Sequence, residues 1–144
     1  MKVSTKGRYA LRLMIDLAEH EAGEYIPLKE ISSRQNVSVK YLEQIVTQLS
    51  RAGLLRSVRG AQGGYRLAKA PEEYSAGEIL RVTEGGLAPI ACLEATAEVC
   101  PRSTSCETLD FWIGLEDVIN RYVDNTTLAD LVRQHQRKLN QNTN

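Results

Sequence analysis

The fold is decided by residues 38–68, SVKYLEQIVTQLSRAGLLRSVRGAQGGYRLA. The first half begins with a serine that can cap a helix, and its apolar side chains recur at a helical spacing. These side chains are Leu42, Ile45, Leu49 and Ala52. The second half has two short strand-like pieces, residues 55–58 and 64–67, around a glycine-rich loop. The order predicts an amphipathic helix that stops at Gly53, followed by a β-hairpin.

The face of this helix opposite the apolar stripe is polar. It carries Ser38, Lys40, Tyr41, Gln44, Gln48 and Arg51. Amide, guanidinium and ammonium groups are the kind that proteins use on base edges and phosphates. Such a face is more often simply solvated, but a basic hairpin follows it directly, which favours DNA contact.

Two shorter helical patterns precede this stretch, at residues 8–20 and 28–35. Asn36 follows the second as a turn residue that tolerates left-handed geometry. Three short helices followed by a hairpin are typical of a winged helix-turn-helix. We therefore expect a mainly α fold with a small β-hairpin wing, a DNA-binding domain over residues 1–70, and a third helix that reads the major groove.

The distribution of charge supports this assignment, although the net charge of the chain is zero. Residues 1–70 carry 12 basic and 6 acidic side chains, a net of +6, and the remainder carries 6 basic and 12 acidic, a net of −6. A basic half joined to an acidic half suggests a polyanion-binding module attached to a second function. Chance segregation of charge is the alternative.

The second half begins near Pro71 with a linker. Ser75 and Glu78 form a capping-box pattern for a helix that ends near Glu84. Residues 87–105 show no sustained period, and a strong helical pattern runs from Glu107 to residue 124. A second capping box, Thr127 with Asp130, predicts a last helix to about residue 139. We expect residues 71–106 to form the linker helix and a loop, and residues 107–144 to form a long helix and a C-terminal helix.

The predicted helix over residues 107–124 has more apolar surface than a chain of this size can cover. Its apolar side includes Trp112, Leu115, Ile119 and Tyr122. A homodimer interface along this helix is the simplest explanation, because a winged helix-turn-helix generally needs two copies to read a site of useful length. Packing back on the first helix is the alternative.

Three cysteines lie in or beside the aperiodic stretch. They are Cys92, Cys100 and Cys106, with the spacing C-x7-C-x5-C. Structural zinc sites usually show tight C-x2–4-C pairs, which are missing here. Three thiols in one loop suit an iron–sulfur cluster, and unrelated buried cysteines are the alternative.

Several of these segments resemble the IscR-type family of bacterial transcription regulators. They include MKVSTKGRYALRLMIDLA at the start, SVKYLEQIVTQLSRAGLL, SVRGAQGGYRLA, SAGEIL, and the three cysteines followed by an F/W-rich helix and TLADLV. The resemblance covers about residues 1–133. It implies a dimeric winged-helix regulator of a double-stranded DNA operator. IscR members bind a 2Fe–2S cluster and control cluster assembly or related genes, NsrR members sense nitric oxide with a cluster, and CymR members regulate cysteine metabolism without one.

The resemblance also implies roles for individual residues at the DNA. Ser38, Tyr41, Glu43 and Gln44 match the recognition-helix positions, and Glu43 stands where the family discriminates between two operator classes. A carboxylate only accepts hydrogen bonds, so it favours cytosine N4. Arg59 and Gly60 match the wing tip that enters the minor groove, where a narrow A·T-rich groove attracts arginine.

The resemblance assigns Cys92, Cys100 and Cys106 as three thiolate ligands of the cluster. IscR itself often has a fourth ligand, a histidine, three residues after the last cysteine, but this chain has Leu109 there. Leucine has no donor atom. The candidates for the fourth ligand are therefore nearby acids, with Glu107 the first choice because we expect it in the first turn of the long helix, where a carboxylate is favoured. The other acids are Asp110, Glu94 and Glu98. Capping of that helix alone is the alternative role of Glu107. The N-terminal helix of a second copy is disfavoured as a source of the ligand, because its Arg8 and Arg12 cannot bind a metal.

Other classes of protein remain as alternatives. A thiol redox or zinc-structured regulator would use the same cysteines without iron, and a regulator that docks a metabolic enzyme is a further alternative. We do not expect an enzyme, because His20 and His135 lie far from the cysteines in sequence. The apolar run from Tyr9 to Ala18 is too short and too charged for a signal peptide or membrane span, so we expect a cytoplasmic protein with no membrane partner.

Overall fold

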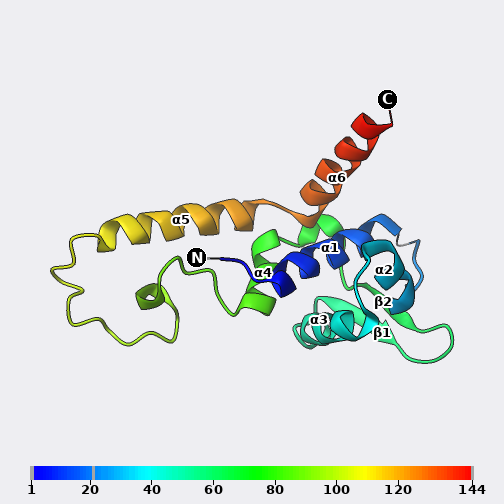
Figure 1. Ribbon diagram of the computed structural model, residues 1–144, viewed down its shortest axis with the longest axis horizontal. Coiled ribbons are helices and arrows are strands. Elements are labelled where there is room, and N and C mark those ends of the chain that lie inside the picture. The colour runs from blue at the N-terminus through cyan, green and yellow to red at the C-terminus, as the bar shows by residue number, and fades with distance from the viewer. Residues whose placement is uncertain (1, 21, 144) are drawn as a thin grey trace.

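A computed structural model describes residues 2–20 and 22–143 of the chain (Figure 1). The described residues form six α-helices, two 3-10 turns and one two-stranded antiparallel sheet. Their bounds are α1 Thr5–His20, α2 Leu28–Gln35, α3 Val39–Arg51, β1 Leu55–Val58, β2 Gly64–Leu67, η1 Pro71–Glu73, α4 Ala76–Glu84, η2 Ala91–Leu93, α5 Leu109–Asn125 and α6 Leu128–Asn142. The predicted mainly α architecture with a small hairpin is confirmed.

The core lies between α1, α2, α3, α4 and the first turn of α6. Leu13, Met14 and Leu17 of α1 are fully buried, and they pack in the same cluster as Ile45 and Leu49 of α3. The stripe predicted on α3 is thus confirmed in its first three members. Ala52 is an exception: it is the exposed C-cap residue of α3, so the helix ends before this side chain can reach the core.

Local signals in the sequence set the ends of the helix-turn-helix. Asn36 ends α2 in the left-handed conformation with φ of 54°, and its N–H donates to the carbonyl of Ser32. The Ser38 hydroxyl accepts a hydrogen bond from the Tyr41 N–H at 3.1 Å and so caps α3. These two residues turn the chain sharply between α2 and α3.

A buried carboxylate holds α1 against α2. Asp16 is 1% exposed and accepts two hydrogen bonds from Arg34 Nε and one from Arg34 Nη2, the last at 2.7 Å. Gln35 Nε2 donates to the same carboxylate at 2.8 Å. Hydrogen bonding to Asp16 raises the pKa of Arg34. A buried charge needs such partners, so this network fixes the angle between the two helices.

The hairpin has a third pairing partner that the sequence pattern does not show. Ile26, between α1 and α2, exchanges two backbone hydrogen bonds of 2.9 Å with Tyr65 of β2. A Cβ at Gly64 would lie 2.3 Å from the Ile26 carbonyl oxygen, so only glycine allows this approach. The wing is therefore tied to the body of the domain at its second strand.

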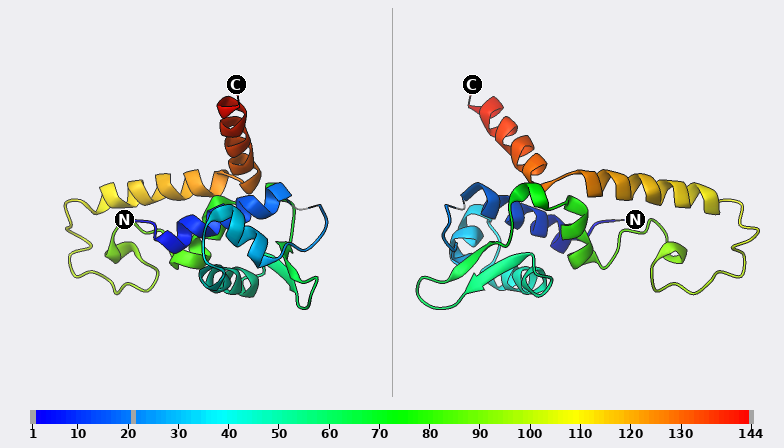
Figure 2. Two further views of the ribbon diagram at one scale, coloured as in Figure 1. Left: turned by 45° about the vertical axis from the view of Figure 1, so that its right-hand side comes forward. Right: turned by 180° about the vertical axis from the view of Figure 1, so that it is seen from behind.

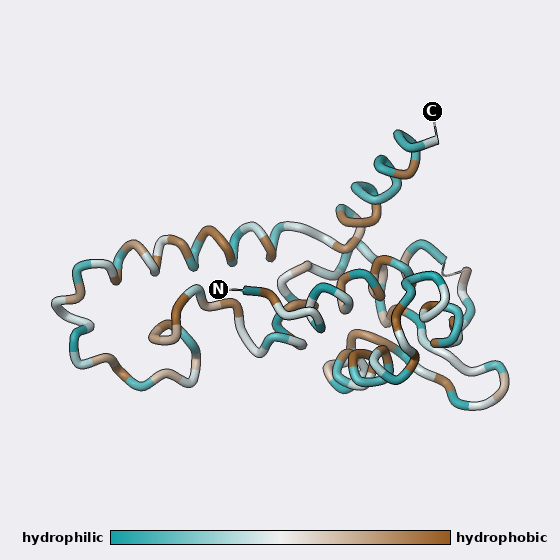
Figure 3. The backbone as a smooth tube through the Cα atoms, viewed as in Figure 1, coloured by the Kyte–Doolittle hydropathy of each residue, from teal (hydrophilic) through white to brown (hydrophobic). Residues whose placement is uncertain are grey.

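The chain beyond α4 forms an arm that leaves this core. Both the loop over residues 85–108 and α5 lie apart from the helix-turn-helix, and α6 projects from the junction in all views (Figures 1 and 2). Apolar segments recur along α5 (Figure 3). The first turn of α6 returns to the core, where Leu128 is fully buried and its N–H donates to the Tyr74 carbonyl at 3.0 Å.

Two predicted boundaries of the arm differ from the structure. α5 begins at Leu109 with Thr108 as its N-cap residue, so Glu107 precedes the helix and the prediction that it lies in the first turn is wrong. Glu107 instead pairs with Arg102 in the loop at 3.5 Å. α6 continues to Asn142, beyond the predicted end, because its last turns have no glycine or proline to stop them.

Candidate nucleic-acid interface and cysteine loop

The recognition helix α3 divides into one buried and one exposed face. Leu42, Ile45, Val46 and Leu49 are buried. The side exposed to solvent carries Lys40, Glu43, Gln44, Thr47 and Arg51. This face offers cations, an amide that can donate and accept, and a carboxylate that only accepts, which is the range of groups needed to read base edges and bind phosphates.

Two of the predicted DNA-binding residues also have structural partners. Ser38 is the N-cap of α3, and Tyr41 is half-buried because its ring packs edge-to-face on Tyr9 at 5.9 Å between centroids. The guanidinium of Arg12 lies 4.7 Å from the Tyr9 ring centroid, and Arg12 also donates to Gln35. Tyr9 and Arg12 support the recognition helix, and the sequence alone does not indicate this role because it depends on contacts between distant residues.

The wing presents a basic tip. Arg56, Arg59 and Gly60 are exposed, and Gly60 has φ of 109°, a conformation that favours glycine. Arg66, on the other strand, points elsewhere: its guanidinium lies 4.7 Å from the Tyr25 ring centroid and donates to the Gly23 carbonyl. The charge available to DNA on the hairpin therefore comes from Arg56 and Arg59.

The base of the wing is joined to the linker by Tyr74, which is 1% exposed. Its hydroxyl donates to the Leu54 carbonyl at 2.5 Å and accepts from the Ala68 N–H at 2.8 Å. One side chain thus connects the two ends of the hairpin to the segment that leads into α4.

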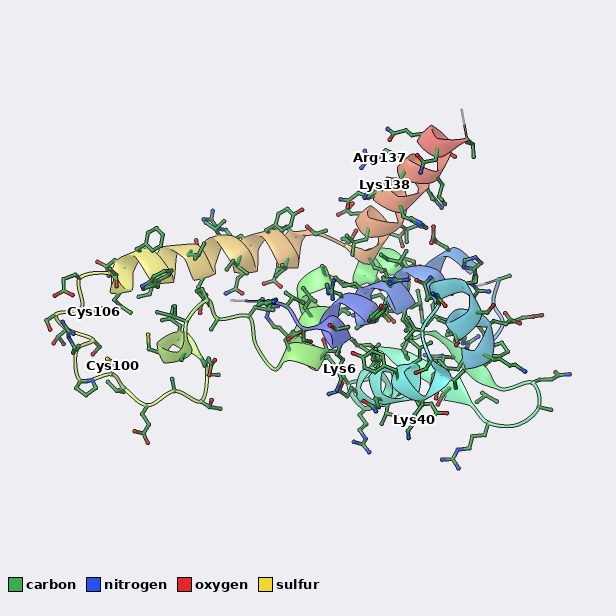
Figure 4. All side chains as sticks on the ribbon, in the orientation of Figure 1. Lys6, Lys40, Cys100, Cys106, Arg137 and Lys138 are labelled. Atoms are coloured by element: carbon green, nitrogen blue, oxygen red, sulfur yellow. The ribbon has the colours of Figure 1, made fainter. Side chains whose placement is uncertain are left out.

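The cysteines lie at the other end of the molecule from α3. Figure 4 shows Lys40 on the recognition helix, Lys6 on α1, and Cys100 and Cys106 on the loop before α5. All three thiols are free; Cys92 is exposed, and Cys100 and Cys106 are half-buried. Among residues 2–20 and 22–143, no three His, Cys, Asp or Glu side chains converge as metal ligands, so one chain in this conformation does not bring the three sulfurs together.

Cys106 differs electrostatically from an ordinary thiol. The backbone N–H of Thr108 and the hydroxyl of Thr108, with its Oγ1 at 3.8 Å from the sulfur, lower the pKa of Cys106. The Leu109 N–H acts in the same direction, and the carboxylate of Glu107 acts against it. The start of α5 therefore favours a thiolate at this position.

The two histidines take part in local contacts. His20 Nδ1 lies 2.9 Å from the Asp16 carbonyl oxygen, and His135 Nδ1 lies 2.9 Å from Glu19 on α1. Neither contact includes a cysteine. In the described part of the chain, no helix combines the length and apolar content that crossing a bilayer requires.

The long helix α5 is apolar but not covered. It has no buried residue, and Phe111, Val118 and Tyr122 are 65%, 55% and 69% exposed. Leu115, which is half-buried, falls on the same stripe, because positions 111, 115, 118 and 122 repeat at a helical spacing. Trp112 and Ile119, on the neighbouring stripe, are half-buried within the single chain.

Comparison with known proteins agrees with this geometry. Residues 3–134 match the Rrf2 family, described as an iron-dependent transcriptional regulator. The chain is 44% identical over 131 residues to the transcriptional regulator CymR of Bacillus subtilis, covering 91% of this chain and 89% of that protein. It is 38% identical over 132 residues to the regulator IscR of Aliivibrio salmonicida, covering 92% and 77%.

A solved structure shows the same likeness in three dimensions. The structure of CymR, called the global cysteine regulator of B. subtilis, superposes with a TM-score of 0.75 at 42% identity, over 93% of this chain and 98% of that one. The relatives in sequence are both named as transcriptional regulators. The chain therefore belongs to the Rrf2 family of transcriptional regulators.

Proposed function

We propose that this protein is a homodimeric regulator that binds a double-stranded DNA operator and whose binding depends on a 2Fe–2S cluster held in the cysteine loop. The observation that carries the DNA-binding part is the exposed polar face of α3 beside a wing with a basic tip. Regulation of cluster assembly or related genes is the corresponding cellular role.

At the operator, some residues of α3 read base edges, and others on α3 and the wing bind phosphates or enter the minor groove. Gln44 can donate to and accept from one adenine, and Glu43 accepts from cytosine N4. Lys40 and Arg51 neutralise phosphates, and Arg59 enters the minor groove. The structural partners of Ser38 and Tyr41 make them positioning residues, and their remaining polar atoms face the DNA backbone.

The second copy of the chain docks on α5. The stripe of Phe111, Leu115, Val118 and Tyr122 is too large an apolar surface to leave in water along a 17-residue helix. Trp112 and Ile119 border this stripe and extend the interface. Two copies related by a twofold axis place two α3 helices on two half-sites, as a palindromic operator requires.

The donor set of the loop fits an iron–sulfur cluster. Cys92, Cys100 and Cys106 are free thiols outside the core, and thiolates are the ligands that such clusters prefer. These three residues would hold the cluster, and the loop must rearrange for their sulfurs to meet. When bound, the cluster supplies a charge and a redox-sensitive link across the loop. Glu107 remains our choice for the fourth ligand, since its side chain is exposed and adjoins Cys106.

A second candidate is a cysteine-responsive regulator with no cluster. The 44% identity to CymR and the solvent access of Cys92 favour it. In that case the thiols respond to oxidation directly. Nitric oxide as the signal is a variant of the first proposal.

Anaerobic purification of the full chain separates the candidates. The cluster proposal predicts broad absorption between about 300 and 450 nm and about two irons and two sulfides per chain. Serine at any of the three cysteines should remove the colour, whereas Ser103→Ala in the same loop should keep it. Colourless wild-type protein without iron would refute the cluster and leave the thiol regulator. Co-purification of a metabolic enzyme would indicate a protein partner.

The fourth ligand is tested by replacing each acid near the cysteines with alanine. Glu107→Ala should shift the spectrum or speed loss of the cluster in air, because it removes one of the proposed ligands. A carboxylate oxygen is a hard ligand that holds iron–sulfur clusters weakly, so the cluster should already be labile in the wild type. Glu94→Ala, Glu98→Ala and Asp110→Ala serve as matched variants. An unchanged spectrum and lifetime in Glu107→Ala would refute this assignment.

A further inference from the structure

The beginning of α1 is capped by a side chain from α4. Glu84 Oε1 accepts the Ser4 N–H at 3.0 Å and the Ser4 hydroxyl at 2.6 Å. The Ser4 hydroxyl oxygen in turn accepts the Gly7 N–H at 3.2 Å. α1 has no acidic residue in its own first turn, so Glu84 supplies the negative charge that the N-terminal end of a helix favours. We call this contact the Glu84–Ser4 clamp.

Gly7 is required for the clamp to close. It is buried, and a Cβ at this position would lie 2.2 Å from Glu84 Oε1 and 2.9 Å from Val3 Cγ1. Any larger residue would push the carboxylate away from Ser4. The close approach of α1 and α4 therefore depends on two residues far apart in the sequence, Gly7 and Glu84.

One side of the clamp adjoins the cysteine loop. Glu84 is the last residue of α4, and Gly85, which ends the helix with φ of 78°, begins the loop. One turn earlier, Arg81 donates to Asn120 at 2.9 Å and forms an ion pair with Asp124, both on α5. The last turn of α4 is thus joined to the start of the cysteine loop through the chain and to the C-terminal half of α5 through Arg81.

The other side of the clamp leads to the DNA-reading surface. About one turn into α1, Tyr9 packs on Tyr41 of the recognition helix. Arg12 stacks on Tyr9 and donates to Gln35 Oε1 at 3.0 Å and to the Gln35 carbonyl at 2.8 Å. A helix moves as a rigid rod, so a shift at the first turn of α1 displaces the groups that seat the first turn of α3.

We infer that Glu84 is a positioning residue, and that the Glu84–Ser4 clamp is the joint through which the cysteine loop sets the position of the recognition helix. This inference rests on the proposed function in that the loop carries the signal. The mechanical link itself, from Glu84 through α1 to Tyr41, does not require a cluster.

The link is tested first without a cluster, by hydrogen exchange on the full-length, cluster-free chain. Glu84→Ala should speed backbone amide hydrogen exchange in α3 residues 41–46 by at least about fivefold, because α1, whose Tyr9 packs on Tyr41, is then held less firmly. Ser4→Ala, a milder change at an exposed position, should act in the same direction. Glu84→Gln keeps an acceptor oxygen and should restore part of the protection. Glu78→Ala is the matched control, since this α4 carboxylate pairs with Lys69. Faster exchange confined to residues 4–8 would overturn the inference.

The coupling is tested next by operator affinity with and without the cluster. Wild type and Glu78→Ala should show the same ratio between the two states, Glu84→Ala should bring it to about one, and Glu84→Gln should lie between them. If Glu84→Ala kept the wild-type ratio of operator affinities with and without the cluster, the inference would be overturned. A ratio of one in wild type would instead refute control by the cluster, and the exchange experiment alone would then decide whether the joint exists.

Discussion

The winged-helix domain and the arm formed by residues 85–125 use their apolar residues in opposite ways. The buried apolar side chains of the described structure lie in the winged-helix domain and its linker, at Leu87 and Pro89, and at the start of α6. α5 has none, although it is just as apolar as the helices of the core. One region completes its core within the chain, and the other keeps apolar side chains exposed, which the proposed homodimer would cover.

The two regions also differ in what their polar groups do. In the winged-helix domain, buried Asp16 accepts hydrogen bonds from the more exposed Arg34 and so fixes the helices, while Lys40 and Arg59 are exposed. In the arm, Asp117 and Arg121 pair along exposed α5. Exposed ion pairs of this kind contribute little stability. The ion pairs along α5 therefore do little to fix the arm, and under the proposed function contacts with a second chain would do so.

The largest expected effect concerns the basic surface of the winged-helix domain. If a dimer neutralises ~6 to 10 phosphates, its operator affinity should fall by roughly 10³ to 10⁵ between 50 and 200 mM salt. Fluorescence anisotropy titrations on a labelled operator would measure this. A curve that does not respond to salt would show that exposed Lys40, Arg51, Arg56 and Arg59 do not meet phosphates.

The next largest effect separates the two regions by stability. Leu49→Ala, at a fully buried position, should lower the free energy of unfolding by about 2–5 kcal/mol at any protein concentration. Phe111→Ala should lower the free energy of unfolding relative to wild type only at high protein concentration, because the ring is covered only when a second chain binds. Chemical denaturation at several concentrations measures both. If Phe111→Ala lowered the free energy of unfolding equally at all protein concentrations, α5 would have to pack within its own chain.

A smaller effect concerns base reading. Gln44→Ala should cost about 1–3 kcal/mol of operator affinity and relax preference at one base pair in each half-site. Gln141→Ala, an exposed glutamine on α6, is the matched control and should change nothing. Affinity selection from a randomised operator would show the result. An equal loss on all sequences would mean that Gln44 contacts only the backbone.

The smallest effect concerns the first turn of α6. The Thr127 N–H donates to Asp130 at 2.9 Å and lowers the pKa of this carboxyl, with further help from the Thr127 hydroxyl and Arg133. A lowered pKa means that the stabilisation is present above the ordinary value of 3.8 and is lost as the pH falls through the lower folded value. Asp130→Ala should therefore lower the melting temperature at pH 7 and have little effect near pH 2. Equal differences at both pH values would contradict this account.

The sequence predicted most where the signal was local. The bounds of α2, β1 and β2 match to the residue, because capping residues and glycines mark these ends. The start of α5 was misplaced by two residues, since Thr108 offers only a weak sequence signal beside the acidic Glu107. The Ile26–Tyr65 pairing and the Asp16 network could not be predicted, because each joins residues that no periodicity relates.

The candidate sites follow the same division. The exposed face of α3 could be predicted from one helix, as its buried stripe defines it. The supports of that face, Tyr9 and Glu84, could not, since their contacts cross between helices. Whether Cys92, Cys100 and Cys106 meet depends on loop conformation, about which spacing carries little information.

The central claim, that a second chain completes the arm, is tested most directly by sedimentation equilibrium. The wild-type protein should show twice the 16.1 kDa mass of the chain, and Val118→Asp should show the single-chain mass, because it places a charge in the apolar stripe. Val99→Asp makes the same chemical change at an 87% exposed loop position and should remain dimeric. A wild-type mass of 16.1 kDa, or a dimeric Val118→Asp, would contradict the account.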